Sequence, residues 1–184
     1  TIQAHDNWIW SISFASQHHL FASCSDDGTI KLWDTLTAQV RGTLTASGRK
    51  ILSLTWIESD FLLASGHDDG MIRLWDMATQ QLVRVFEGHQ GWIRSLVFNP
   101  DDKTLMSGAQ DNTIRVWQLD TGECLRVLTA HQGWVTSIAL ADQNNLFVTG
   151  SADATVRIWD LGTQQCLRTI QLPLPYDGMN ISHA

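Results

Sequence analysis

Four tryptophans recur along this chain at a constant interval of 42 residues, at Trp33, Trp75, Trp117 and Trp159. The segments that end near them align without insertion, as DDGTIKLWD, DDGMIRLWD, QDNTIRVWQ and ADATVRIWD. A second segment recurs ahead of three of them, as HDNWIWSISF, HQGWIRSLVF and HQGWVTSIAL. A strict repeat of this length indicates one supersecondary unit per repeat, each packed against its neighbours.

Each repeat contains four short stretches rich in β-branched, aliphatic and aromatic residues, with turn residues between them. The Asp-Gly dipeptides at 27–28 and 69–70 are typical of tight hairpins, whereas Asp-Asn at 111–112 is a weaker version. Asp-Ala at 153–154 is a less favourable turn sequence. Because no helical period of useful length appears, the sequence predicts an all-β fold of four-stranded units.

Apolar columns in the first strand of each repeat are spaced by three and then two residues, as at Ile9, Ile12 and Phe14. A step of three within a period of two predicts a β-bulge. We interpret these columns as the inward side of the strand, filled by core residues. By alternation, Trp8 and Trp10 are then not needed for that core.

At these residues the chain resembles the WD40 repeat family, over nearly all of residues 5–172. The resemblance implies a WD40 β-propeller with four four-stranded blades. The repeats span 1–172, at about 5–46, 47–88, 89–130 and 131–172, with a C-terminal tail at 173–184. Since propellers usually close with more blades, we expect an open arc or part of a larger ring.

The same resemblance implies a buried hydrogen-bonded tetrad in each blade: a histidine before the first strand, a hydroxyl in the second, an aspartate in the next turn and a tryptophan in the third strand. Ser47 occupies the histidine column of the second repeat, so we expect blade two to be the least stable. By position, the tetrad residues are His5, Ser23, Asp27 and Trp33; Ser65, Asp69 and Trp75; His89, Ser107, Asp111 and Trp117; and His131, Thr149, Asp153 and Trp159.

Recurring His, Ser and Asp residues also suggest a hydrolase triad, which requires an exposed nucleophile and an oxyanion hole. Since the trio is present in three repeats, we favour a structural network, no enzyme activity and no catalytic residues. The one compact cluster of ligand-type residues is His67-Asp68-Asp69. It offers no recognisable ligand spacing, so we expect neither a metal nor any other cofactor.

The resemblance places partner contacts on the top face, where the first strand begins and where the turn before the tetrad Asp lies. We expect Trp8, Trp92 and Trp134 to matter most, because large aromatics and arginine dominate interface energies. The alternative is that these rings only cover blade edges and tetrad histidines. The top-face positions are Trp8, Trp10 and Asp26; Lys50, Leu52 and Asp68; Trp92, Arg94 and Gln110; and Trp134, Thr136 and Ala152.

The formal net charge of -7 disfavours nucleic acid, and no apolar run is long enough to span a membrane. Cys124 and Cys166 share a column with Val40 and Leu82, so we expect them to be small core residues. Three cysteines without a CxxC motif favour a reducing cytoplasm.

The tail LPLPYDGMNI (172–181) leaves the repeat. It resembles the segment that ends WD40 arrays in bacterial, cyanobacterial-type signalling ATPases of the NACHT or NB-ARC class. That resemblance implies the sensor end of a larger protein. No Gly-rich phosphate loop is present in the 184 residues.

The sequence therefore predicts a non-catalytic scaffold that binds protein or peptide partners. A purely structural repeat array without a dedicated site is the first alternative. A propeller that binds a small ligand or a sugar is the second, although it would need clustered non-repeat polar residues at the centre. The outer blades would expose apolar surface unless further blades of a longer chain or a second copy cover it.

Overall fold

The computed structural model describes residues 2–45, 48–141 and 145–171 as four sheets, each with four antiparallel strands. The all-β, four-bladed prediction is confirmed. Two short 3-10 segments, η1 (Ser16–His18) and η2 (Glu58–Asp60), interrupt the first two blades. The strands are β1 (Ile9–Ala15), β2 (Leu20–Ser25), β3 (Thr29–Asp34), β4 (Val40–Thr45), β5 (Ile51–Ile57), β6 (Leu62–His67), β7 (Ile72–Asp76), β8 (Gln81–Phe86), β9 (Ile93–Asn99), β10 (Thr104–Ala109), β11 (Ile114–Gln118), β12 (Cys124–Leu128), β13 (Val135–Ala141), β14 (Leu146–Ser151), β15 (Thr155–Asp160) and β16 (Cys166–Gln171).

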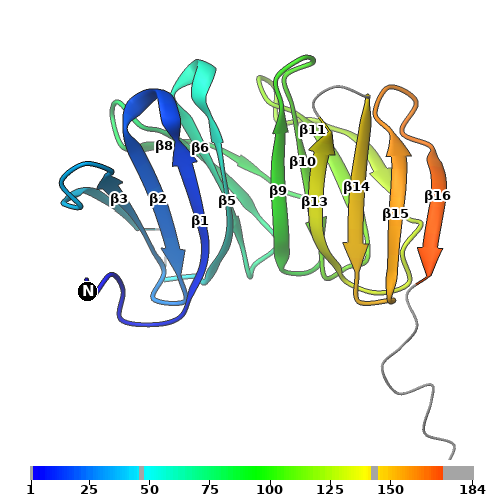
Figure 1. The fold of residues 1–184 in the computed structure, drawn as a ribbon, viewed down its shortest axis with the longest axis horizontal. Coiled ribbons are helices and arrows are strands. Elements are labelled where there is room, and N and C mark those ends of the chain that lie inside the picture. The colour runs from blue at the N-terminus through cyan, green and yellow to red at the C-terminus, as the bar shows by residue number, and fades with distance from the viewer. Residues whose placement is uncertain (1, 46–47, 142–144, 172–184) are drawn as a thin grey trace, which may run out of the picture.

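The blades stand side by side in chain order and form an open arc (Figure 1). Within each sheet the strands pair in sequence order, from the first strand on the inside to the fourth on the outside. The first strands β1, β5, β9 and β13 adjoin one another along the arc. The described residues form no closed ring.

A break in register near the start of the first strand recurs in every blade. In blade one it lies between Ile9 and Ser11 opposite β2, and in blade four between Val135 and Ser137 opposite β14. The bulge predicted from the spacing of three is therefore confirmed. It turns the top-face end of each first strand relative to the rest of the strand.

The hairpin turn before each third strand requires a left-handed backbone. Its φ is +78° at Gly28 and Gly70, +67° at Asn112 and +62° at Ala154. Glycine adopts this region without steric cost, and asparagine tolerates it. The weaker turn sequence at 153–154 therefore places an alanine in a conformation that its Cβ disfavours.

Apolar side chains from neighbouring sheets make three cores, one between each pair of blades. Between blades one and two, Ile30 and Leu32 pack with Leu54, Leu63 and Trp75. Burial of these side chains removes apolar surface from water, at roughly 25 cal/mol per Å². Each blade thus depends on its neighbours for stability, as expected for a repeat protein.

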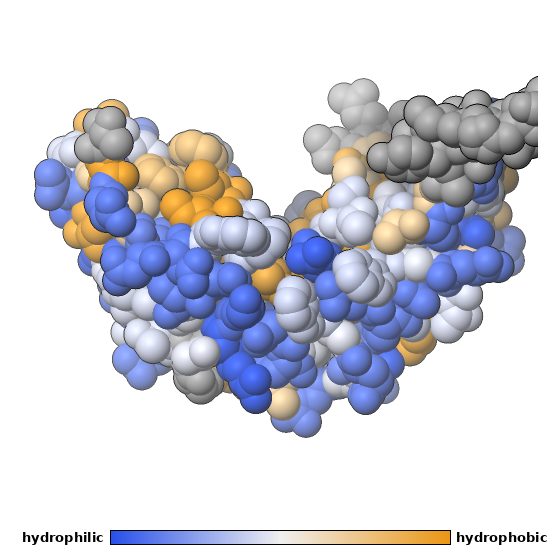
Figure 2. Space-filling view, turned by 90° about the horizontal axis from the view of Figure 1, so that it is seen from below, coloured by the Kyte–Doolittle hydropathy of each residue, from blue (hydrophilic) through white to orange (hydrophobic). Residues whose placement is uncertain are grey.

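The first strand of blade one departs from the core assignment made above. Ile9, Ile12 and Phe14 are 44%, 56% and 64% exposed, although their counterparts Ile51 and Leu54 in blade two are buried. The physical reason is that no described blade precedes blade one. Figure 2 shows hydrophobic surface on this N-terminal arm, facing the notch between the two ends of the arc.

The expected core position is wrong for Cys166, whereas Cys124 packs against the edge of the core between blades two and three. Their column lies at the start of the fourth strands, where Val40 and Leu82 are 47% and 45% exposed. Cys166 is exposed and Cys124 half-buried, because the outer strand of each blade has a neighbour on one edge only. Cys24, in β2, is the buried thiol among the three.

Two parts of the sequence interpretation lie outside the described residues. Ser47, the replacement in the histidine column, is one of them, and the C-terminal tail beyond 171 is the other. Within the described residues, no helix is long and apolar enough to cross a membrane.

Candidate partner-binding face

The top-face positions of each blade meet through one backbone hydrogen bond. It joins the amide nitrogen of the turn residue to a carbonyl oxygen at or just before the start of the first strand. The same bond recurs in all four blades: Asp26 to Trp8 at 3.0 Å, Asp68 to Lys50 at 3.1 Å, Gln110 to Trp92 at 3.0 Å and Ala152 to Trp134 at 2.9 Å. Three of these turn side chains are polar, and the fourth is Ala152.

An arginine lies among three tryptophans on this face. The guanidinium carbon of Arg94 is 5.6 Å from the ring centroid of Trp10, 5.8 Å from that of Trp92 and 6.0 Å from that of Trp134. Each distance is within the range of a cation–π interaction. We call these four residues the Trp–Arg cluster. It draws on blades one, three and four, so only the assembled arc brings it together.

Leu52 of blade two and Thr136 of blade four complete the surroundings of this cluster. Together with Trp10 and Arg94, they line a shallow pocket. A single repeat column, at residues 10, 52, 94 and 136, therefore supplies apolar, cationic and hydroxyl groups to this pocket. Alignment identified each position separately but not their convergence.

Asp26 ties blade one to blade two beside the cluster. Its carboxylate accepts a hydrogen bond from the indole Nε1 of Trp10 at 2.7 Å and forms an ion pair with the Nζ of Lys50 at 2.8 Å. Burial alone would raise the pKa of Asp26, but these two donors outweigh it and lower the pKa. Lys50 also lies 5.9 Å from the ring centroid of Trp92.

Asp68, the counterpart of Asp26 in blade two, has a different environment. Leu52 stands where blade one has Trp10, so the indole donor is missing. The Oδ1 atom of Asp68 is buried without a hydrogen-bond partner among the described residues. Burial is the main reason that the pKa of this carboxyl is raised.

The top-face tryptophans are accessible to different extents. Trp8, Trp134 and Trp10 are 71%, 47% and 38% exposed, and Trp92 is half-buried. Trp8 packs edge-on against Trp10 with the ring centroids 5.9 Å apart. Indole surface of this extent is unusual outside interfaces, where tryptophan is enriched. The partner-binding role of these residues stays a prediction.

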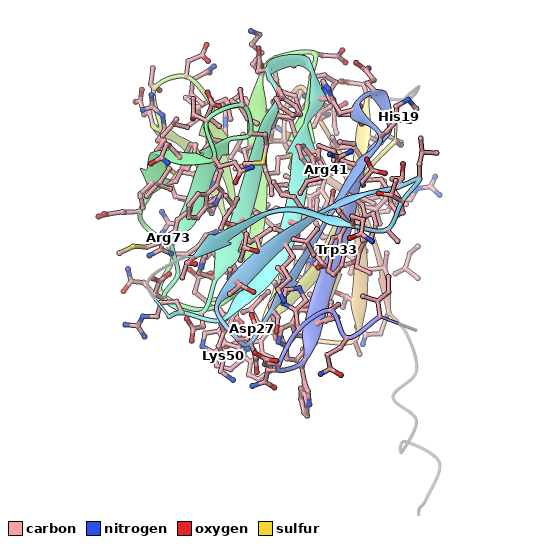
Figure 3. The ribbon with its side chains drawn as sticks, turned by 90° about the vertical axis from the view of Figure 1, so that its left-hand side faces the viewer. His19, Asp27, Trp33, Arg41, Lys50 and Arg73 are labelled. Atoms are coloured by element: carbon pink, nitrogen blue, oxygen red, sulfur yellow. The ribbon has the colours of Figure 1, made fainter. Side chains whose placement is uncertain are left out.

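Asp27 and Lys50 lie toward the same end of the molecule, whereas Arg41 and His19 lie toward the opposite end (Figure 3). Figure 2 views the molecule from the side on which Asp27 and Lys50 lie. This face is largely hydrophilic or of intermediate hydropathy, and the strongly hydrophobic surface gathers at the notch. The top face and the exposed apolar face of blade one are thus distinct surfaces.

The residues assigned to the tetrad of blade one are joined by hydrogen bonds. His5 contacts Asp27 Oδ2 through Nδ1 at 2.8 Å and Ser23 Oγ through Nε2 at 2.7 Å. The indole Nε1 of Trp33 donates to the same Ser23 Oγ at 2.9 Å. The corresponding residues are joined in the same way in blades three and four: His89, Asp111, Ser107 and Trp117, and His131, Asp153, Thr149 and Trp159.

A further residue belongs to these networks that the sequence analysis missed. In blade one, Thr29 Oγ1 donates to Asp27 Oδ1 at 2.7 Å, and Thr113 and Thr155 make the same bond in blades three and four. Burial alone would raise the pKa of Asp27, but hydrogen bonds from Thr29 and His5 lower it to about 2. A threonine two residues after each of these aspartates was the available signal.

The hydroxyls of the tetrads are poor candidates for nucleophiles. Ser23 is 2% exposed, and Ser107 and Thr149 are fully buried. Each hydroxyl oxygen already accepts a hydrogen bond from an indole and contacts a histidine nitrogen. A buried oxygen with its partners in place has no access to a substrate. These groups fit a structural network.

Blade two uses a different arrangement. His67, at the end of β6, places Nε2 2.8 Å from Ser65 Oγ, which also accepts the indole N–H of Trp75 at 2.8 Å. Asp69 pairs with Arg73 at 2.8 Å. His67 therefore replaces, from within the sheet, the imidazole that the other blades receive from the loop before the first strand.

The environment of His67 disfavours its charged form. Burial, together with the positive charge of Arg73, lowers the pKa of His67 to about 3, against the opposing effect of Asp69. The Nδ1 atom is buried without a hydrogen-bond partner among the described residues. His67 thus has a structural role that its repeat column, with Ser25, Ala109 and Ser151, did not suggest. Among the residues that the structure describes, no group of three or more His, Cys, Asp or Glu side chains could hold a metal ion.

Four-stranded antiparallel blades with His–Ser/Thr–Trp networks define a class of β-propeller repeats. The WD domain, G-beta repeat family matches residues 1–34, 38–76, 80–118 and 122–160. The chain belongs to this family. Its members are in general protein-interaction scaffolds and typically non-catalytic.

Similar curated proteins share only short stretches with this chain. A ribosome biogenesis protein WDR12 homolog from Chlamydomonas reinhardtii is 43% identical over 56 residues, which cover 29% of this chain and 12% of that protein. Two proteins named as probable cytosolic iron-sulfur protein assembly proteins Ciao1 match over 33 residues, or 18% of this chain and 10% of each relative. They come from Aedes aegypti, at 48% identity, and Culex quinquefasciatus, at 46%. The matched regions thus span a small part of these relatives.

Proposed function

We propose that this chain is a non-catalytic scaffold that binds a protein or peptide partner through its top face. The observation that carries the proposal is the Trp–Arg cluster, where indoles from three blades surround one guanidinium. Tryptophan and arginine are the residue types most enriched among the hot spots of interfaces. The rings are held by a rigid sheet scaffold, which lowers the entropic cost of binding.

Two other functions predict different behaviour. In a purely structural array, the top-face tryptophans would cover the scaffold, and no single top-face substitution would change binding. Yet Trp8 is 71% exposed and its side chain covers little. A site for a sugar or another small ligand would need convergent non-repeat polar groups, whereas the pocket beside Arg94 is lined mainly by Trp10, Leu52 and the methyl-bearing Thr136.

The test is a selection of peptides from a random library on the immobilised chain, followed by affinity measurements on the tightest peptide. We expect Trp92→Ala and Trp134→Ala to weaken binding by roughly 30-fold, because loss of a hot-spot side chain costs about 2 kcal/mol. Leu125→Ala is the matched control, since Leu125 is 45% exposed on the outer strand β12. Unchanged affinity in both tryptophan variants would show that the site is misassigned.

The role as sensor of a larger bacterial signalling protein, located in the cytoplasm, remains a prediction from the sequence. The tail segment that suggests it lies outside the described residues. The relatives reported above are eukaryotic and do not include such a protein.

A second binding function concerns the two ends of the arc, and we propose that a second copy of this chain pairs there. Val148, Val156 and Ile158 of blade four occupy the repeat positions of Met106, Ile114 and Val116, which blade four buries. In blade four, these three side chains are only half-buried. The matching surface is the exposed face of blade one, with Ile12 and Phe14.

Hydrogen bonds between blades support this pairing. Ser53 Oγ donates to the carbonyl oxygen of Ile93 at 3.3 Å, and Ser95 Oγ accepts from the amide of Ile138 at 3.0 Å. Ser137, the next serine in this column, is exposed. Strand β1 of a second copy would offer Ser137 the same kind of backbone partner.

Light scattering over a range of concentrations tests this pairing. We expect a species of twice the 20.6 kDa chain mass, and a monomer for Ile12→Asp, because a buried unpaired carboxylate is costly. Leu125→Asp should still pair. A mass of 20.6 kDa at every concentration would contradict the pairing and leave further blades of a longer chain as the cover for these faces.

A further inference from the structure

The position of Arg94 specifies the chemistry of the partner, an inference that rests on the proposed function of the top face. The side chain of Arg94 has no hydrogen bond or ion pair with any other described residue. The other top-face cation, Lys50, is already paired with Asp26. Arg94 is therefore a cation whose nitrogen donors are unused within the described part of the chain.

The three indoles contact this cation but leave the N–H donors of its guanidinium without a hydrogen-bond acceptor. A cation–π contact attracts the guanidinium to the indole rings, but an indole offers it no oxygen or nitrogen acceptor. The five N–H donors lie in the plane of the group and match a carboxylate in a two-point hydrogen bond. The contacts with three indoles restrict the side chain before the partner arrives, so less conformational entropy is lost on binding.

We propose that Arg94 binds the carboxylate of an Asp or Glu side chain in a peptide segment of the partner. The indoles of Trp10, Trp92 and Trp134 contact the apolar residues that flank this carboxylate. The pair is charge-assisted and shielded from water by the rings, which strengthens it relative to an exposed ion pair.

The surrounding charges favour a carboxylate over a phosphate group. A phosphate carries close to two negative charges at neutral pH and three acceptor oxygens, and it is usually bound by several cations. Among the aligned top-face positions Arg94 is the single unpaired cation, since the charge of Lys50 is offset by Asp26. Burial raises the pKa of Asp68 and the neighbouring Arg49 acts to lower it, so the positive charge of Arg49 already faces a carboxyl of the same chain. Asp68 adds a further carboxyl to the same face. One guanidinium is matched to one carboxylate.

The test uses three pools of synthetic seven-residue peptides with random flanks and a fixed central residue: glutamate, glutamine or phosphoserine. We expect the glutamate pool to bind the wild-type chain about tenfold more tightly than the glutamine pool, as for one well-placed charged hydrogen bond. Arg94→Gln should abolish this preference, so that the glutamate and glutamine pools bind the variant equally well. Arg94→Lys should retain part of it, since lysine keeps the charge but loses the two-point geometry.

Arg41→Gln is the matched control. Arg41 is paired with Asp34 and lies toward the opposite end of the molecule from Lys50 (Figure 3), so the preference should be unaffected. Circular dichroism and thermal unfolding would show that each variant is folded.

The outcomes separate this inference from the proposed function. Equal binding of the glutamate and glutamine pools, with binding still lost in Trp92→Ala, would overturn the carboxylate but leave the top-face site. Preference for phosphoserine would overturn it in favour of a phosphopeptide. Failure of all three pools to bind would overturn both proposals.

Discussion

Replacement of Trp117 with alanine is expected to lower the free energy of unfolding by about 3–5 kcal/mol, the range for large buried aromatics. Trp117 is 1% exposed and packs against Phe86 and His89, with ring centroids 5.9 Å and 6.0 Å away. Its Nε1 also donates to Ser107 Oγ at 2.8 Å. The variant loses this packing and leaves the hydroxyl without its donor. Denaturant unfolding of both proteins measures the difference.

Two further variants separate the contribution of the hydrogen bonds from that of the buried indole. Ser107→Ala should cost about 1–3 kcal/mol, because the indole of Trp117 and the imidazole of His89 lose their shared partner while staying buried. Trp8→Ala removes the same residue type from a position that is 71% exposed, and should change stability by less than about 0.5 kcal/mol. If Trp117→Ala were no more destabilising than Trp8→Ala, the structural role of the networks would be wrong.

Blade two should make the stability of the protein depend on pH below about 6.5. His67 has a pKa lowered to about 3 in the folded chain, by burial and by Arg73, from an ordinary value of 6.5. Between these values the unfolded chain binds a proton that the folded chain does not. The free energy of unfolding therefore falls as pH falls through this window, by up to about 1.4 kcal/mol per pH unit. The contribution of His67 to stability is fully present above pH 6.5.

His67→Gln isolates this contribution, since glutamine does not titrate. The carboxyls with lowered pKa values, including Asp27 and Asp69, are common to both proteins and destabilise both at low pH. The wild-type curve should thus be steeper than the variant curve between pH 3 and 6.5. Parallel curves from chemical denaturation at each pH would contradict this prediction, because they would mean that His67 takes up its proton over the same pH range in the folded and the unfolded chain.

The sequence was sufficient for the features that each repeat encodes locally. The spacing of Ile9 and Ile12 predicted the bulge, and the alignment of Trp33 with its counterparts predicted four units of four strands each. These features follow from alternation, turn chemistry and period, which act over a few residues. Because the repeat varies little, the same local interactions produce the same strands and turns in all four blades.

Features that depend on neighbouring blades could not be predicted from the sequence. The counterparts of Phe14 are buried or packed against a core in blades two to four, yet Phe14 is exposed, because a repeat column does not reveal whether another blade covers it. His67 was compared only with the residues of its own repeat column. In the structure it contacts Ser65 in place of the imidazole that a loop supplies in the other blades. The convergence of Trp10 and Trp134 on Arg94 likewise requires the curvature of the arc.

Hydrogen–deuterium exchange of the chain, with and without the tightest library-selected peptide, tests the central claim most directly. A top-face site predicts slower exchange at amides near the starts of the first strands, around residues 8–10, 50–52, 92–94 and 134–136, and in the turns beside them. The outer strands β4, β8, β12 and β16 should be unaffected. Protection confined to those outer strands, or to the exposed face of blade one, would contradict the assignment of the top face as the partner-binding surface.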